Sequence, residues 1–407
     1  MSYPASVPVI KIAWPTQFSR KFLGDTGWVM VANLAQAAGP FVGLLVIARW
    51  HGMAAAGQFA YAQALTAPIA QLLNLQLKAL LLTHQVAELP LGTAVSIRIL
   101  TSVVGVALIL LLLFASGPLT GIWMGSRLAD SWAELFQADL QRAGRMSRAA
   151  ISVVLRAAGL IVLLALSASL EAALLGYVLF SLLLLLTLDW QPLRRPLNWN
   201  WAMLSPVVYR GVMLGVVLCL QAANSSIPRI VLEQNTDAST LGIFVTASVV
   251  LQAGNLLASA FGQILLPAMA NSPLFRIASW TLVPFSAALF ALLITVAASS
   301  WLLTFFHLSS SSIAKNTLLA LSFAQLTIWP ATMLGYALTA RRLYREMLWL
   351  GLGLIVVSSF SSWLLVIPFG SVGAAMSIAS SGLATVLICF WLLSRSRPRN
   401  DIAGATS

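Results

Sequence analysis

The sequence predicts an all-α polytopic membrane protein with about twelve transmembrane helices in two pseudo-symmetric six-helix bundles. Three observations support this fold class: 59% of the 407 residues are apolar, only 8% are charged, and the mean hydropathy is +0.91. Ordinary soluble domains carry about 25% charged residues, and a soluble fold has too little interior to bury so many apolar side chains. These values exclude a soluble enzyme, a secreted disulfide scaffold and a disordered chain.

The apolar runs divide into twelve segments of about the 20 residues that a helix needs to cross a bilayer. The first run continues through an Ala-Gln-Ala sequence at 35–37, which indicates an uncleaved span rather than a signal peptide. The fourth is the most polar, and the polar break at 190–196 separates six spans from six. The expected spans are 24–48, 53–77, 98–117, 118–141, 147–168, 171–189, 208–230, 239–264, 279–303, 314–339, 345–368 and 371–394.

The chain has 23 lysines and arginines against 11 acidic residues, a net charge of +12. In a membrane protein this excess is typical of cytoplasmic loops, so it does not indicate nucleic-acid binding. With twelve spans, eighteen basic residues fall on the side of the termini, and only Arg49, Arg229 and Lys315 fall on the opposite side. This bias predicts a multi-pass membrane protein with both termini in the cytoplasm.

The two halves of the chain repeat a short pattern. Residues 48–52 (ARWHG) precede 57–60 (GQFA), and residues 228–230 (PRI) precede 241–244 (LGIF). Each half therefore has an arginine at the end of one span and Gly-x-Phe at the start of the next. The spans that follow both carry Gln-x-x-Asn, as Gln71/Asn74 and Gln252/Asn255. Because repeated halves around a central site are a common transporter plan, we expect two six-helix bundles, 1–195 and 196–407, the second with a short cytoplasmic tail.

These motifs resemble the polysaccharide flippases of the multidrug/oligosaccharidyl-lipid/polysaccharide (MOP) exporter superfamily. Residues 48–60 are similar to their first hairpin, 140–151 (LQRAGRMSRAAI) to the turn between their spans four and five, and 229–268 to their spans seven and eight. The resemblance covers most of the chain in order, although Pro228 stands where the family usually has an acidic residue.

The resemblance implies a flippase that moves a polyprenyl-pyrophosphate-linked oligosaccharide across the membrane by alternating access. Such proteins serve polysaccharide biosynthesis, either of O-antigen or of exopolysaccharide, so the resemblance also implies a multi-pass protein of the bacterial cytoplasmic (inner) membrane. The implied partners are the lipid-linked oligosaccharide, membrane lipids, and a polymerase with other polysaccharide-assembly proteins.

Charged residues at membrane depth are costly and are therefore candidates for a binding site. Arg127, Asp130 and Glu134 follow at i, i+3 and i+7, which places them on one helical face. Arg156 lies about two turns into the fifth span. Because a guanidinium grips phosphate through its planar fork, a cavity lined by these arginines suits a pyrophosphate headgroup, with the two acids limiting its positive charge. Alternatively, Arg127 and Glu134 only pair with neighbouring side chains.

A second set of candidates comes from the repeated motifs. Arg49 and Arg229 close the two hairpins and either contact the headgroup or extend to the membrane surface. Amide side chains supply both donors and acceptors for sugar hydroxyls, or they bond between helices. The amides that we expect in a central cavity are Gln71, Asn74, Gln252 and Asn255.

The sequence contains no signature of catalysis. His51, His84 and His307 lie far apart near span ends, and there is no HExxH sequence, Walker A motif or recognisable triad. Cys219 and Cys389 lie in apolar runs and match neither a disulfide framework nor a metal spacing. We therefore expect no enzymatic activity, cofactor, metal site or nucleic-acid partner.

Two other functions remain as alternatives. A drug/cation antiporter of the same superfamily would share the fold and usually needs an acid deep in a span, for which Asp130 and Glu134 are the candidates. A polytopic glycan polymerase or acyltransferase is disfavoured, because every predicted loop is short and no span carries a central histidine.

The charge bias generates a testable topology. A reporter fused after Arg399 is expected to be active only in a format that works in the cytoplasm, because eighteen of the basic residues belong to that side. Activity of a periplasmic reporter at this position would contradict the twelve-span topology.

Overall fold

The computed structural model describes residues 20–83, 89–189, 197–270, 272–306, 308, 312–341 and 343–396. The expected break at 190–196 and the residues His84, His307 and Arg399 lie outside this part of the chain. The described residues form α1 (Arg20–Trp50), α2 (Met53–Asn74), α3 (Leu77–Thr83), α4 (Leu91–Ser116), α5 (Pro118–Arg142), α6 (Met146–Leu166), α7 (Leu170–Leu184), the π-helical η1 (Leu185–Asp189), α8 (Trp201–Asn235), α9 (Ala238–Met269), α10 (Leu274–Ala297), α11 (Ser299–Phe305), α12 (Ser312–Ala340) and α13 (Tyr344–Arg395).

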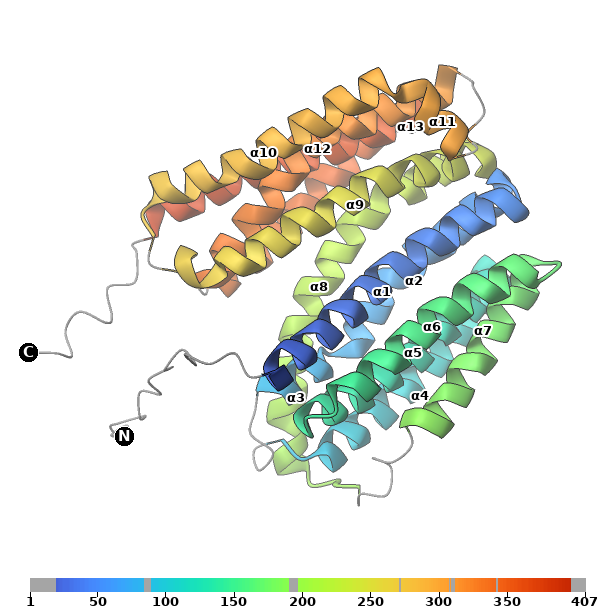
Figure 1. Cartoon of the computed structure of the whole chain (residues 1–407), viewed down its shortest axis with the longest axis vertical. Helices are drawn as coiled ribbons and strands as arrows, with labels where there is room; N and C mark the ends of the chain where they lie inside the picture. Colours follow the sequence, from blue (N-terminus) through green and yellow to red (C-terminus); the bar gives the residue numbers. More distant parts are fainter. Residues whose placement is uncertain are drawn as a thin grey trace, which may run out of the picture.

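The helices form two groups that meet along α2, α8 and α9 (Figure 1). Helices α1 and α4 to α7 lie on one side, and α10, α12 and α13 lie on the other. Helix α8 packs against both α2 and α13, and α2 packs against both α8 and α9. The division into bundles 1–195 and 196–407 stays a prediction, and its expected boundary lies outside the described residues.

The structure confirms an all-helical protein with many membrane spans. In the described part of the chain, nine helices are long and apolar enough to cross a bilayer, or ten when the bent α9 is included as one span. Helix α5 fails this test because it carries Arg127, Asp130 and Glu134 among other charges, although its 25 residues are long enough to cross. Together with α5 and the two arms of α13, the described helices account for the twelve expected spans.

Helix α13 is a hairpin rather than one helix. A straight helix of 52 residues would be about 78 Å long, far more than a bilayer requires. Gly370 interrupts it with φ of 54° and ψ of −128°, a conformation that glycine adopts without a steric penalty. Ser362 precedes Gly370 and Ser377 follows it, and their hydroxyl oxygens are 2.7 Å apart. The second arm therefore returns along the first. The expected separate spans 345–368 and 371–394 correspond to these arms.

Large apolar side chains cover the outside of the helices. Phe114 is 89% exposed at the end of α4, Leu166 is 79% exposed at the end of α6, and Ile264 is 75% exposed on α9. Such side chains would be unfavourable in water but suit hydrocarbon. This apolar surface is therefore suited to contact with the lipid of a bilayer.

The two Gly-x-Phe motifs meet where α2 crosses α9. A Cβ atom on Gly57 would overlap the carbonyl oxygen of Ala238, and a Cβ atom on Gly242 would overlap the carbonyl oxygen of Met53. Each glycine therefore contacts the carbonyl four residues before the other glycine, which is a local twofold relation. Phe59 and Phe244 follow these glycines and are both fully buried. The close approach of the two backbones requires glycine at both positions.

Replacing either crossing glycine should separate α2 from α9. Gly57→Ala and Gly242→Ala are each expected to lower stability by about 1–3 kcal/mol, the usual cost of forcing an extra carbon into a tight contact, seen as a lower thermal unfolding midpoint in detergent. Gly335→Ala in α12 is the matched control, because no atom lies within 4 Å of its added Cβ. Equal midpoints for all three variants would contradict the crossing.

Candidate functional site

A cavity of about 370 Å³ opens between α1, α2, α3 and α5. A second cavity of about 80 Å³ shares part of this wall and reaches α6 and α7. The polar side chains of the larger cavity are Gln36, Gln71, Asn74, Gln76, Lys78, Arg127, Asp130, Ser131 and Glu134. The smaller cavity adds Arg156 and Tyr177. The two cavities together form the candidate site.

Helix α5 supplies the charged wall. The chain enters this helix through Gly117, whose φ of 86° suits glycine, and Pro118 occupies the first turn, where its missing N–H is not needed. Arg127, Asp130 and Glu134 line the same cavity. The other faces of α5 are packed by buried residues such as Phe136, so the three charges are confined to the cavity side.

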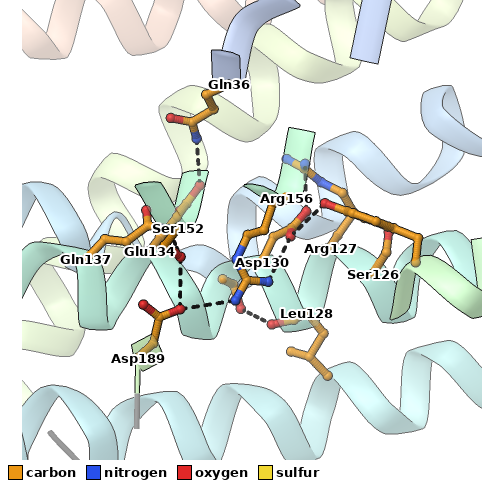
Figure 2. Close-up of polar contacts among 12 residues, drawn as sticks. Gln36, Ser126, Arg127, Leu128, Asp130, Glu134, Gln137, Ser152, Arg156 and Asp189 are labelled. Atoms are coloured by element: carbon orange, nitrogen blue, oxygen red, sulfur yellow. Dashed lines mark hydrogen bonds and ion pairs between the residues drawn. The ribbon is translucent and has the colours of Figure 1, made fainter. Parts of the chain in front are cut away.

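A chain of ion pairs joins three structural elements beside the cavity (Figure 2). Arg127 Nη1 lies 3.7 Å from Asp130 Oδ2, and Asp130 Oδ1 lies 3.8 Å from Arg156 Nη1 on α6. Arg156 Nη2 donates a hydrogen bond of 3.2 Å to Asp189 Oδ2 in η1. The Arg127 side chain is 35% exposed, whereas that of Arg156 is 7% exposed. Arg127 is therefore the accessible end of this row of ion pairs, and Arg156 is its buried centre.

Asp189 anchors the buried end of this chain. Its side chain is fully buried, and Oδ2 also accepts a hydrogen bond of 3.1 Å from the Ser152 hydroxyl. In the sequence, Asp189 only marked the polar end of an apolar run, so its role was missed. The one available signal was a carboxylate at the last position of the sixth expected span.

Glu134 is held by amides instead of arginines. Gln36 on α1 donates to Oε1 at 3.2 Å, and Asn74 on α2 donates to Oε2 at 2.8 Å. The Asn74 carbonyl oxygen Oδ1 in turn accepts a hydrogen bond of 2.7 Å from Arg98 Nη2. This network ties α1, α2, α4 and α5 together at the cavity wall.

Arg98, one of the eighteen basic residues assigned to the side of the termini, was not expected at the site. The structure places it two turns inside α4, where it is 1% exposed. Its guanidinium donates to the backbone carbonyls of Leu73 and Asn74, both at 3.2 Å. It thereby satisfies carbonyls that the end of α2 leaves without helical partners. The chain then passes through two left-handed residues, 75 and 76, into α3, which brings Lys78 to the cavity.

Four residues expected at the site lie elsewhere in the described structure: Arg49, Arg229, Gln252 and Asn255. Arg49 lies at the exposed end of α1 with its guanidinium 5.1 Å from the Trp50 ring centre, and Arg229 lies in the last third of α8. The amide of Gln252 donates to Ser248 on its own helix at 3.2 Å, and Asn255 accepts from Thr332 on α12 at 2.8 Å. The second-half amides thus bond among α9 and α12, while their counterparts Gln71 and Asn74 line the cavity.

The three arginines and three acids of the cluster balance in charge. Arg98, Arg127 and Arg156 face Asp130, Glu134 and Asp189, and Lys78 adds one positive charge at the larger cavity. Such balance is required at membrane depth, where an unpaired charge is costly. In the described residues, no three histidine, cysteine or acidic side chains are grouped closely enough to hold a metal ion.

The two arginines are expected to differ in their effect on stability. Arg156→Leu should lower stability by about 3–5 kcal/mol, because it leaves Asp189 buried without its cation. Arg127→Leu should change stability by less than about 1 kcal/mol, because its ion pair is longer and more exposed. Thermal unfolding midpoints of the purified variants measure the difference. Equal unfolding midpoints for the two variants would show that Arg156 contributes no more to stability than Arg127.

Comparison with known proteins supports a transporter fold. No family model matches the sequence. The chain is 24% identical over 392 residues to the capsular polysaccharide biosynthesis protein CapF of Staphylococcus aureus, covering 90% of this chain and 98% of that protein.

Solved structures resemble the chain over nearly its whole length. The lipid II flippase MurJ in an inward closed conformation aligns with a TM-score of 0.74 at 11% identity, covering 91% of this chain and 87% of MurJ. An inward-facing MATE-family multidrug transporter of the MOP superfamily aligns with a TM-score of 0.68 at 14% identity, covering 91% of this chain and 97% of the other. At such identities the likeness concerns the fold. The protein is therefore a multi-pass membrane protein that shares the fold of these two solved structures.

Proposed function

We propose that the protein is a flippase that moves a polyprenyl-pyrophosphate-linked oligosaccharide across the cytoplasmic membrane for O-antigen or exopolysaccharide synthesis. The observation that carries the proposal is the cavity between α1, α2, α3 and α5, which combines Arg127 and Lys78 with a wall of amides. A pyrophosphate needs cations, and sugars need donors and acceptors. The names of the similar proteins support it too, since one serves capsular polysaccharide biosynthesis and another flips lipid II.

Two cations can reach the headgroup from different elements. Arg127 comes from α5 and is the more exposed of the two arginines on Asp130, and Lys78 comes from α3. The apolar tail costs nothing to leave in hydrocarbon, whereas the charged headgroup is expensive there. In the proposed mechanism the headgroup and sugars pass through the cavity while the tail stays in lipid.

The glycine crossing of α2 and α9 suits alternating access. It brings the two repeated hairpins into contact, and the charged cavity lies farther along α2, lined by Gln71 and Asn74. In the proposed cycle, the two helix groups pivot so that this crossing opens and the other end closes. Both termini lie in the cytoplasm, and a polymerase and other assembly proteins consume the flipped product.

A second candidate function is drug/cation antiport. Three carboxylates lie in the cluster, at Asp130, Glu134 and Asp189, and the MATE-family transporter of the same fold is described as a multidrug transporter. The two functions differ in the charge of the cargo. An antiporter would export cationic dyes and leave glycan unaffected, whereas the flippase acts on a lipid-linked anion.

Arg127→Ala is expected to abolish glycan export in a strain that lacks the chromosomal copy, because the accessible guanidinium for the headgroup is lost. Lipid-linked oligosaccharide should then accumulate in the inner leaflet, measured by labelling spheroplasts and inverted vesicles with a lectin. Arg127→Lys should restore export only partly, since a point charge replaces the planar fork.

The control for this experiment is Arg395→Ala. This variant removes an exposed arginine at the end of α13, which contacts the Trp391 ring and lines neither of the two cavities. It should export normally. Normal export by Arg127→Ala at equal protein level would rule out Arg127 as a headgroup ligand. Loss of dye export with intact glycan export in the deletion strain would favour the antiporter.

A further inference from the structure

Arg156 has hydrogen-bond donors that the protein leaves unused. Nη2 donates to Asp189, whereas Nε and Nη1 are buried without a hydrogen-bond partner. The side chain is 7% exposed and lines the smaller cavity together with Asp130 and Tyr177. A buried guanidinium with free donors in a cavity wall suits an anion with several acceptor oxygens, such as a phosphate group.

Asp130 stands between this guanidinium and that of Arg127. Its two oxygens lie 3.7 and 3.8 Å from the arginine nitrogens, farther than a hydrogen bond allows. These are ion pairs that a better hydrogen-bonding anion can replace. An anion bound by both arginines would lie close to the Asp130 carboxylate, and two negative charges in a poorly hydrated site repel each other strongly.

We propose that binding of the phosphate headgroup at Arg127 and Arg156 is accompanied by the uptake of one proton from solvent at Asp130. The inference rests on the proposed function and specifies how its site accepts an anion. Both arginines stay charged and exchange the Asp130 oxygens for phosphate oxygens. The proton goes from water to one carboxylate oxygen of Asp130, and it returns to water when the headgroup leaves.

Tyr177 makes Asp130 the acid that accommodates a proton. The Tyr177 hydroxyl donates a hydrogen bond of 3.2 Å to Asp130 Oδ1. A hydroxyl also accepts hydrogen bonds, so the protonated acid can donate to the same oxygen. Ser181 lies one turn along α7, and its buried hydroxyl oxygen has no partner. It is the acceptor for the Tyr177 hydrogen once the direction of the bond reverses.

Each of the other two acids lacks either a hydroxyl partner or access to the cavities. Glu134 is held by the amide groups of Gln36 and Asn74, and an N–H group cannot accept a hydrogen bond from a protonated acid. Asp189 lines neither of the two cavities and is bonded to Arg156 and the Ser152 hydroxyl. Neither acid is therefore poised to exchange its charge for a proton.

Among the described residues, the other charged side chains that line the larger cavity or are bonded next to the cluster are cations. Lys78 on α3 lines the larger cavity, Arg98 on α4 bonds to Asn74, and Arg148 on α6 donates to the Leu188 carbonyl. They attract an anion and offer no site for an extra proton. Asp130 is thus the group at which proton uptake and anion binding meet.

Calorimetry tests the proposal with farnesyl pyrophosphate as the probe and the purified full-length protein in lipid nanodiscs. Binding heats in two buffers of different ionisation enthalpy give the number of protons taken up. The wild type should take up about one more proton per bound probe than Asp130→Asn. For each unit that the pH rises, the affinity of the wild type for the probe should therefore fall by an additional factor of about ten compared with Asp130→Asn. Subtracting Asp130→Asn removes any protonation of the probe itself.

Two further variants separate the acids. Glu134→Gln removes a carboxylate from the same cavity and should retain the proton uptake. Tyr177→Phe should reduce it, because the protonated Asp130 loses its acceptor; this variant keeps the test sharp if Asp130→Asn unfolds. Equal uptake by the wild type and Asp130→Asn would overturn the inference but leave headgroup binding intact. Failure of the wild type to bind the probe would overturn both the inference and the proposed headgroup site, whereas the export assay tests flipping independently.

Discussion

The pairing of charge at membrane depth is the constraint on which the rest of the structure depends. An isolated ion in hydrocarbon is so costly that each charged side chain needs a partner, either on its own helix or on a neighbouring one. Arg156 meets this requirement by contacting Asp130 on α5 and Asp189 in η1. The packing of α5 against α6 and α7 therefore follows from charge as well as from shape. The π-helical turn at Leu185–Asp189 carries the carboxylate to the place where the arginine needs it.

On helices that hold few charges, amide side chains and backbone carbonyls serve as the partners of buried charged groups. Arg98 links the end of α2 to α4, and Asn74 passes the connection on to Glu134. The break after α2 places two residues in the left-handed region, which costs energy for side chains other than glycine. Arg98 offsets part of this cost by bonding to the exposed carbonyls. The same break turns α3 so that Lys78 reaches the cavity, which connects a local strain to the site.

Close packing supplies what charge does not. Helices in lipid gain little from the hydrophobic effect and associate through short contacts between small residues. The reciprocal contact of Gly57 and Gly242 is of this kind, and it joins the two helix groups at one crossing. A cluster of paired charges in one group and a close glycine crossing between the groups together suit a protein that binds an anion and then releases it.

Sequence patterns alone were enough to predict the class of the protein, because hydropathy and the length of apolar runs are local properties. They predicted the helical membrane fold, the reversal between 368 and 371, and the grouping of Arg127, Asp130 and Glu134 on one face, since helical periodicity determines which neighbours share a face. The motif resemblance predicted the superfamily fold that the solved structures share. The assignment of site residues beyond that face was incomplete. Only tertiary packing decided that Arg98 turns inward, that Asp189 pairs with Arg156, and that Gln252 and Asn255 bond away from the cavity occupied by Gln71 and Asn74. A hydrogen bond or ion pair between helices depends on their rotation and depth, and neither is encoded in the pattern of a single segment.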